Sequence, residues 1–143
     1  MINKMKKTFT TLSKEKQLSI MQLVGELSLA LFEDYCEPKE SAPGELIESI
    51  RVFLNNPGDH ERYLFGKADE KFRCLVTRSL GKADNFRELH NSIIAIANVS
   101  SFIYSSENKE FIFSATEALE FACRASDNIR DELEKVFAKL ESQ

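Results

Sequence analysis

The sequence is poor in the residues on which metal binding and covalent cross-linking depend. Among 143 residues there are three Cys, two His, five Gly and no Trp. Cys36, Cys74 and Cys123 lie far apart and form no CxxC pair, which argues against a disulfide framework and a zinc site. The Gly residues do not cluster, so no glycine-rich phosphate-binding loop is expected. We therefore expect no cofactor and no metal.

Catalytic motifs are missing as well. The HExxH, GxSxG and EF-hand patterns do not occur, and neither His60 nor His90 belongs to a recognisable triad or ligand set. A histidine on a helix of a small α-bundle resembles the site of histidine phosphotransfer domains. That family follows its histidine with a lysine and a small residue, whereas this chain has Ile93 and Ile94 there. Isoleucine neither neutralises nor admits a phosphoryl group, so we interpret the chain as a non-enzyme with no catalytic residues.

Long apolar runs and an excess of positive charge are also lacking. No segment approaches the ~20 consecutive apolar residues that span a bilayer, and the opening MINKMKKTFTTLSKEK has no signal-peptide core. The formal net charge is −4 and the sequence pI is near 5.3. Binding to nucleic acid requires a concentrated basic face. These features predict a cytoplasmic protein that contacts neither a membrane nor nucleic acid directly.

The sequence predicts one helical domain over residues 1–143. Hydrophobic residues make up 43% of it, eleven of them Phe, and their period is near 3.6 almost throughout. No strand-like alternation competes with this pattern. The prediction is an all-α bundle of about six helices, with a frayed N-terminus at residues 1–12. The expected helices begin at or just after Ser13, Pro43, Asp59, Asp84, Ser106 and Asp127.

Apolar patterning indicates how these helices are arranged. The helices expected after Asp84 and Ser106 are apolar on every side, which is typical of a central hairpin. The helix expected after Asp59 carries Tyr63 and Phe65 in its apolar pattern, closes at Gly81 and has a possible bend at Gly66.

Charge is distributed unevenly, because two acidic stretches flank a basic middle. Residues 26–48 hold seven carboxylates and one cation, and residues 107–134 hold eight carboxylates and three cations. Glu26, Glu33 and Glu37 fall within about 20° of one line on a helix. Like charges at such spacing repel, so we predict that these stretches face a charged partner. The candidate contact residues are Glu26, Glu33, Asp34, Glu37, Glu40, Glu45, Glu48, Asp127, Asp131 and Glu134.

Two segments, LALFEDYCEPKESAPGELIESIRVFL and RSLGKADNFRELHNSIIAIA, together with the acidic, Phe-rich helical character, carry a family resemblance. The chain resembles the helical immunity proteins of bacterial contact-dependent growth inhibition systems. The resemblance implies a cognate protein toxin as partner, often a basic nuclease whose active site an acidic surface occludes. The alternative is a helical adaptor or regulatory module that uses the same faces for another partner. Replacing His90 or His60 by Gln is expected to leave the protective function largely intact.

Overall fold

The computed structural model describes residues 1–36, 39–79, 86–105 and 112–142, and these residues contain seven α-helices and no strand. The predicted all-α class is confirmed for these ranges. The helices are α1 (Ile2–Thr11), α2 (Lys14–Tyr35), α3 (Ala42–Asn55), α4 (Asp59–Ser79), α5 (Phe86–Tyr104), α6 (Ile112–Ala125) and α7 (Asp127–Glu141).

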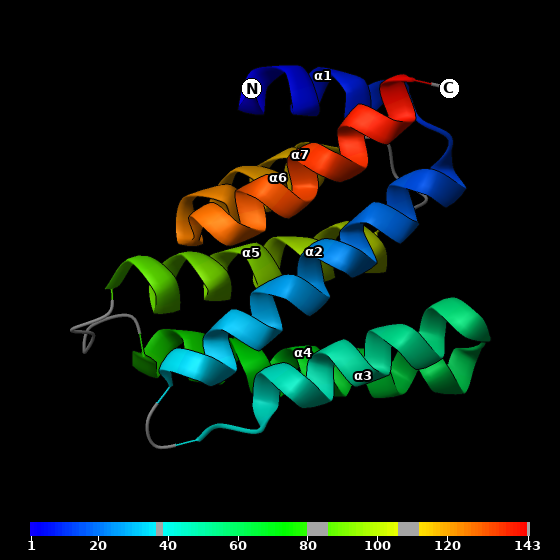
Figure 1. The fold of residues 1–143 in the computed structure, drawn as a ribbon. Coiled ribbons are helices and arrows are strands. Elements are labelled where there is room, and N and C mark those ends of the chain that lie inside the picture. The colour runs from blue at the N-terminus through cyan, green and yellow to red at the C-terminus, as the bar shows by residue number, and fades with distance from the viewer. Residues whose placement is uncertain (37–38, 80–85, 106–111, 143) are drawn as a thin grey trace.

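The helices are stacked in layers (Figure 1). α1 lies across α6 and α7 at the top of the view, α2 and α5 cross the middle, and α3 and α4 form the bottom layer. α5 packs most extensively against α6 on one side and α2 on the other, in agreement with the expected central hairpin. Buried side chains from all seven helices join one hydrophobic core. The α3–α4 layer therefore has one face on the core and one face outward.

Local sequence signals set several helix boundaries. The Ser13 hydroxyl accepts a hydrogen bond from the backbone N–H of Lys16, which caps α2 as predicted. Pro43 lies in the first turn of α3, where its missing N–H costs nothing. α7 begins at Asp127 as predicted, but the capping side chain is that of Ser126. Short polar side chains and proline thus define these starts before any tertiary contact is considered.

Small residues let the middle layer approach its neighbours. Ala118 and Ala122 on α6 are fully buried. Gly25 on α2 lies where a Cβ atom would come within 3.0 Å of Ile47 Cδ1 and 3.4 Å of Val99 Cγ1. α2 therefore approaches α3 and α5 closely at this point, and a larger residue would push them apart.

The prediction of a frayed terminus at residues 1–12 is wrong. These residues form α1, whose Met5 and Phe9 are buried, and the ring of Phe9 meets that of Phe102 edge-on at 5.9 Å. Lys6 Nζ also donates to Glu120 on α6 at 2.7 Å. α1 is the helix that raises the expected number from about six to seven.

Three further expectations about side chains and bends differ from the structure. Gly66 does not bend α4 into two segments, because the helix runs unbroken from Asp59 to Ser79. Tyr63, which the apolar pattern of α4 includes, is 60% exposed and does not join the core. The helix expected to be apolar on every side after Ser106 also has an outward face, because Phe113 on α6 is 69% exposed. The predicted boundaries at Gly81, Asp84 and Ser106 lie outside the described residues.

Candidate protein-binding surfaces

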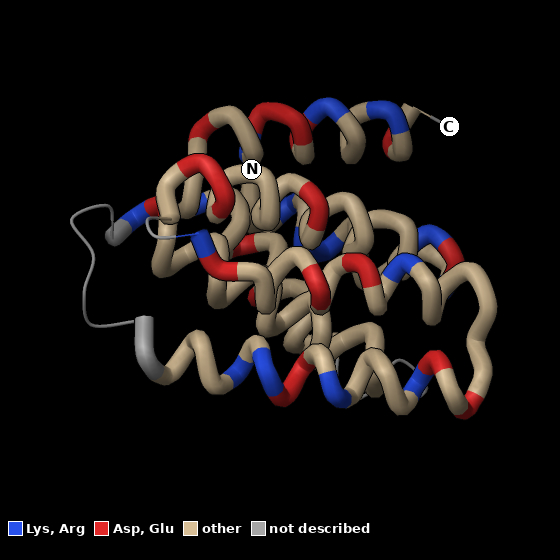
Figure 2. Tube along the Cα trace, turned by 90° about the horizontal axis from the view of Figure 1, so that it is seen from below, with Lys and Arg blue, Asp and Glu red and all other residues tan. Residues whose placement is uncertain are grey.

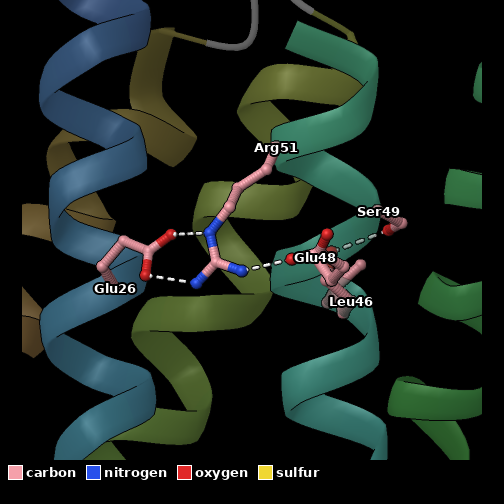
Figure 3. Close-up of polar contacts among 5 residues, drawn as sticks. All are labelled: Glu26, Leu46, Glu48, Ser49 and Arg51. Atoms are coloured by element: carbon pink, nitrogen blue, oxygen red, sulfur yellow. Dashed lines mark hydrogen bonds and ion pairs between the residues drawn. The ribbon is translucent and has the colours of Figure 1, made fainter. Parts of the chain in front are cut away.

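Arg51 on α3 holds two of the predicted contact residues in an ion-pair network (Figure 3). Its Nε and Nη2 atoms donate to the two carboxylate oxygens of Glu26 on α2, each at 2.6 Å, and its Nη1 donates to Glu48. The hydrogen bonds to Glu26 and then to Glu48 raise the pKa of the Arg51 guanidinium. Such a bidentate pair fixes geometry as well as charge. Glu26, which is half-buried, therefore joins α2 to α3 instead of standing open to a partner.

Two more predicted contact residues pair with cations from the basic middle of the sequence. Glu45 on α3 accepts a hydrogen bond from Lys71 on α4 at 2.7 Å, and Asp127 accepts one from Arg87 at 2.8 Å. The bond from Arg87 lowers the pKa of Asp127. Figure 2 shows Lys and Arg interleaved with Asp and Glu along the helices. Charges that are segregated in the sequence therefore compensate one another in space.

A smaller set of carboxylates remains uncompensated at the end of α2. Glu33 and Asp34 in the last turn of α2, and Glu40 in the segment before α3, are exposed, and none forms an ion pair with another described side chain. One cation lies close, because Lys39 Nζ donates to the backbone oxygen of Glu33 at 2.5 Å. Glu37 lies outside the described residues. We call Glu33, Asp34 and Glu40 the acidic tip.

The acidic tip adjoins a shallow cavity that the end of α2 shares with the starts of α5 and α7. The cavity has a volume of about 280 Å³, and its lining includes Leu31, Tyr35, Arg87 and Asp127. Tyr35 is 38% exposed here. The two acidic stretches of the sequence thus meet at one end of the bundle, beside an accessible aromatic ring. Sequence spacing gave no sign of this meeting, because it depends on how α2 and α7 cross.

The remaining predicted contact residues lie further along α7. Asp131 is exposed and has no ion pair among the described residues. Glu134 is half-buried, and its carboxylate lies 4.0 Å from Arg130 Nε. Asp127, Asp131 and Glu134 therefore share a helix face as predicted from their spacing, but they differ in exposure and pairing.

A second surface, which the sequence did not indicate, is a groove between α3 and α4. It has a volume of about 630 Å³, and Val52 and Leu64 in its lining are 42% and 44% exposed. Charged side chains border it, among them Glu45, Glu48 and Lys67. Val52 and Leu64 are apolar residues outside the buried faces of α3 and α4. Their position outside the apolar pattern of each helix is the only signal in the sequence for this groove.

The described residues contain no cluster of three or more His, Cys, Asp or Glu side chains that could hold a metal ion. His60 is exposed in the first turn of α4, and His90 is half-buried on α5. Burial raises the pKa of the Cys123 thiol to about 11, so this cysteine stays protonated near neutral pH.

Comparison of the chain with protein-family models, with curated proteins and with solved structures finds no match. None of the helices in the described ranges is long and apolar enough to cross a membrane.

Proposed function

We propose that the chain is an immunity protein that acts in the cytoplasm by binding a cognate toxin domain. The toxin class that fits its acidic surface is a basic nuclease, whose active site that surface would occlude. The observation that supports this proposal is the acidic tip, where Glu33, Asp34 and Glu40 are exposed without an ion-pair partner among the described residues. A basic groove that binds phosphates offers the complementary surface.

The surroundings of the acidic tip favour protein binding. Tyr35 lies directly beside Asp34 and borders the cavity of about 280 Å³. Tyrosine is enriched among residues that dominate binding energy, because it buries a large ring and retains a polar group. The carboxylates would steer a basic partner toward the tip, and Tyr35 would supply buried contact area. We therefore assign the leading role to the tip and Tyr35.

The paired carboxylates have a different role in this proposal. Glu26 and Glu48 bind Arg51, and Glu45 binds Lys71, within the chain itself. A partner cation would have to compete with these internal cations. Glu26, Glu45 and Glu48 are thus expected to shape the surface more than to contact a toxin directly.

The test compares two charge reversals of equal size in binding to the purified product of the adjacent gene. The double variant Glu33→Lys, Asp34→Lys alters the acidic tip, and Asp131→Lys, Glu132→Lys alters an exposed pair of neighbouring carboxylates on α7. The tip reversal is expected to slow association more than tenfold at low salt, and high salt should narrow that difference. The α7 reversal is expected to bind nearly as the parent does.

Circular dichroism confirms that each variant is folded. If both reversals bind like the parent and salt has no effect, the acidic tip is only solvated and the proposal is wrong. If the adjacent product binds at the tip but has no toxic activity, the chain is instead a helical adaptor or regulatory module.

A further inference from the structure

The outward face of the α3–α4 layer combines exposed apolar side chains with open space. α3 and α4 run antiparallel as the bottom layer of the molecule, and no other described helix covers their outer side (Figure 1). The groove of about 630 Å³ lies between them, with Val52 on one wall and Leu64 on the other. Exposed apolar side chains in a groove of this size are typical of an interaction site.

The two walls of the groove carry opposite charge. Glu45 and Glu48 border it on the α3 side, and Lys67 and Lys71 border it on the α4 side. One carboxylate, Glu61, interrupts the basic wall, but it accepts a hydrogen bond from Asn56 Nδ2 at 3.1 Å beside the turn between the helices. The α3 wall of the groove therefore combines Val52 with carboxylates, and the α4 wall combines Leu64 with two lysines.

We propose that this face binds a second copy of the chain, with α3 of each copy packed against α4 of the other. A two-fold axis that lies in the interface parallel to the helices produces this arrangement. Such an axis exchanges the two walls, so the acidic wall of each copy meets the basic wall of the other. Closed two-fold dimers with self-complementary faces are the commonest oligomers.

The register of the two walls agrees with this symmetry. Glu45 and Lys71 lie at the same height along the layer, because their side chains meet at 2.7 Å within one chain. Rotation about an axis parallel to the helices preserves height, so Glu45 faces Lys71 of the second copy. Val52 and Leu64 line the same groove. The same two-fold rotation brings Val52 of each copy toward Leu64 of the other. Apolar and charged layers thus match in one orientation.

The size of the face sets the expected strength of the dimer. α3 has 14 residues, so the face is about 21 Å long and two helices wide. Stable interfaces bury about 800 Å² on each partner, and this face is at or below that size. We expect a weak dimer whose population depends on protein concentration.

The first test is sedimentation velocity of the purified chain over a wide range of concentration. The weight-average mass is expected to rise from the 16.3 kDa of the monomer toward twice that value. The variants Val52→Asp and Leu64→Asp are expected to remain monomeric throughout. The matched control is Phe113→Asp, because Phe113 is exposed on α6, away from the groove, and its variant should dimerise like the parent.

The second test uses two single charge reversals, Glu45→Lys and Lys71→Glu. Each variant alone breaks the Glu45–Lys71 pair within the chain and also places like charges across the interface, so it should lose dimerisation. Mixing the two variants cannot restore the pair within either chain, so recovery of the dimer reports on the interface alone. A mixture of the two places opposite charges at both contacts, so it should form a mixed dimer. Both residues are exposed, so neither change is expected to unfold the chain, and circular dichroism checks this.

These tests separate a dimer on this face from the other occupants. If the parent stays monomeric at every concentration, the groove does not bind a second copy, and a helix of another protein is the remaining occupant. If the parent dimerises but the Val52, Leu64 and charge variants have no effect, the dimer uses a different face. Either result overturns the proposal without bearing on the acidic tip.

Discussion

At the scale of single residues, whether a charged side chain is paired or open to solvent depends on partners that are distant in the sequence. Glu26 and Arg51 are 25 residues apart, yet they form the bidentate pair between α2 and α3. Helical spacing correctly puts Glu26 and Glu33 near one line, but it says nothing about which neighbouring helix covers that line. This is why the sequence predicted an open stripe of carboxylates along α2, while the structure pairs Glu26 with Arg51 and leaves Glu33 without an ion pair among the described residues.

The Glu26–Arg51 pair leads to a prediction about stability. Replacing Arg51 by Ala removes two hydrogen bonds to a half-buried carboxylate and should lower the free energy of unfolding by about 1 kcal/mol. The control is Lys135→Ala, because Lys135 is exposed and lies 4.0 Å from its acidic neighbour Glu132. Urea denaturation measures both variants. If both variants lose the same free energy of unfolding, the Glu26–Arg51 pair contributes no more to stability than an exposed ion pair does.

At the scale of helices, the sequence predicts best where local signals define the boundary. Ser13, Pro43 and Asp127 mark helix starts because capping and proline geometry act within one turn. α1 was missed, since it contains three lysines and buries only two side chains, Met5 and Phe9. A helix with so few apolar side chains is stable only when it packs against another surface. In this fold α1 packs against α6 and α7.

The ion pair that joins α1 to α6 leads to a prediction about pH. The hydrogen bond from Lys6 lowers the pKa of Glu120 below its usual value. A lowered pKa in the folded state means that the pair stabilises the fold above the unfolded pKa of about 4.3, and that this stability is lost as the pH falls through the folded pKa. Glu120→Gln should therefore be less stable than the parent at neutral pH.

The difference between Glu120→Gln and the parent should shrink as the pH falls below about 4. Urea denaturation at a series of pH values measures this difference. The control is Glu132→Gln, because Glu132 is exposed on α7 and its nearest cation is 4.0 Å away. A constant difference between Glu120→Gln and the parent across the whole pH range would contradict the prediction.

At the scale of the whole molecule, the fold class was predictable and the surface was not. The 3.6-residue period is a local property, and it identified an all-α chain with a central apolar hairpin. The distribution of charge over the surface depends on how helices cross, and pairs such as Arg87–Asp127 bring the basic middle of the sequence onto its acidic flanks. The groove between α3 and α4 could not be predicted either, because its two walls come from different helices.

The shared core leads to a prediction about unfolding as a whole. The chain should give a strongly helical circular dichroism spectrum and one cooperative thermal transition. Reductant should leave the midpoint unchanged, because Cys36, Cys74 and Cys123 form no disulfide in the structure. The same melting curve with and without reductant checks this. A midpoint that falls on reduction, or a spectrum rich in sheet, would contradict it.

The position of α1 on α6 and α7 has a consequence for the newly made chain. The surface against which α1 packs is encoded about a hundred residues later, in Phe102 of α5 and in α6 and α7. At roughly 5–20 residues per second, the ribosome needs on the order of ten seconds to supply it. During that interval the apolar side chains of α1 are uncovered, and transiently exposed apolar surface of this kind is prone to aggregation. The rest of the bundle can collapse first, and α1 completes the fold after synthesis has reached α7.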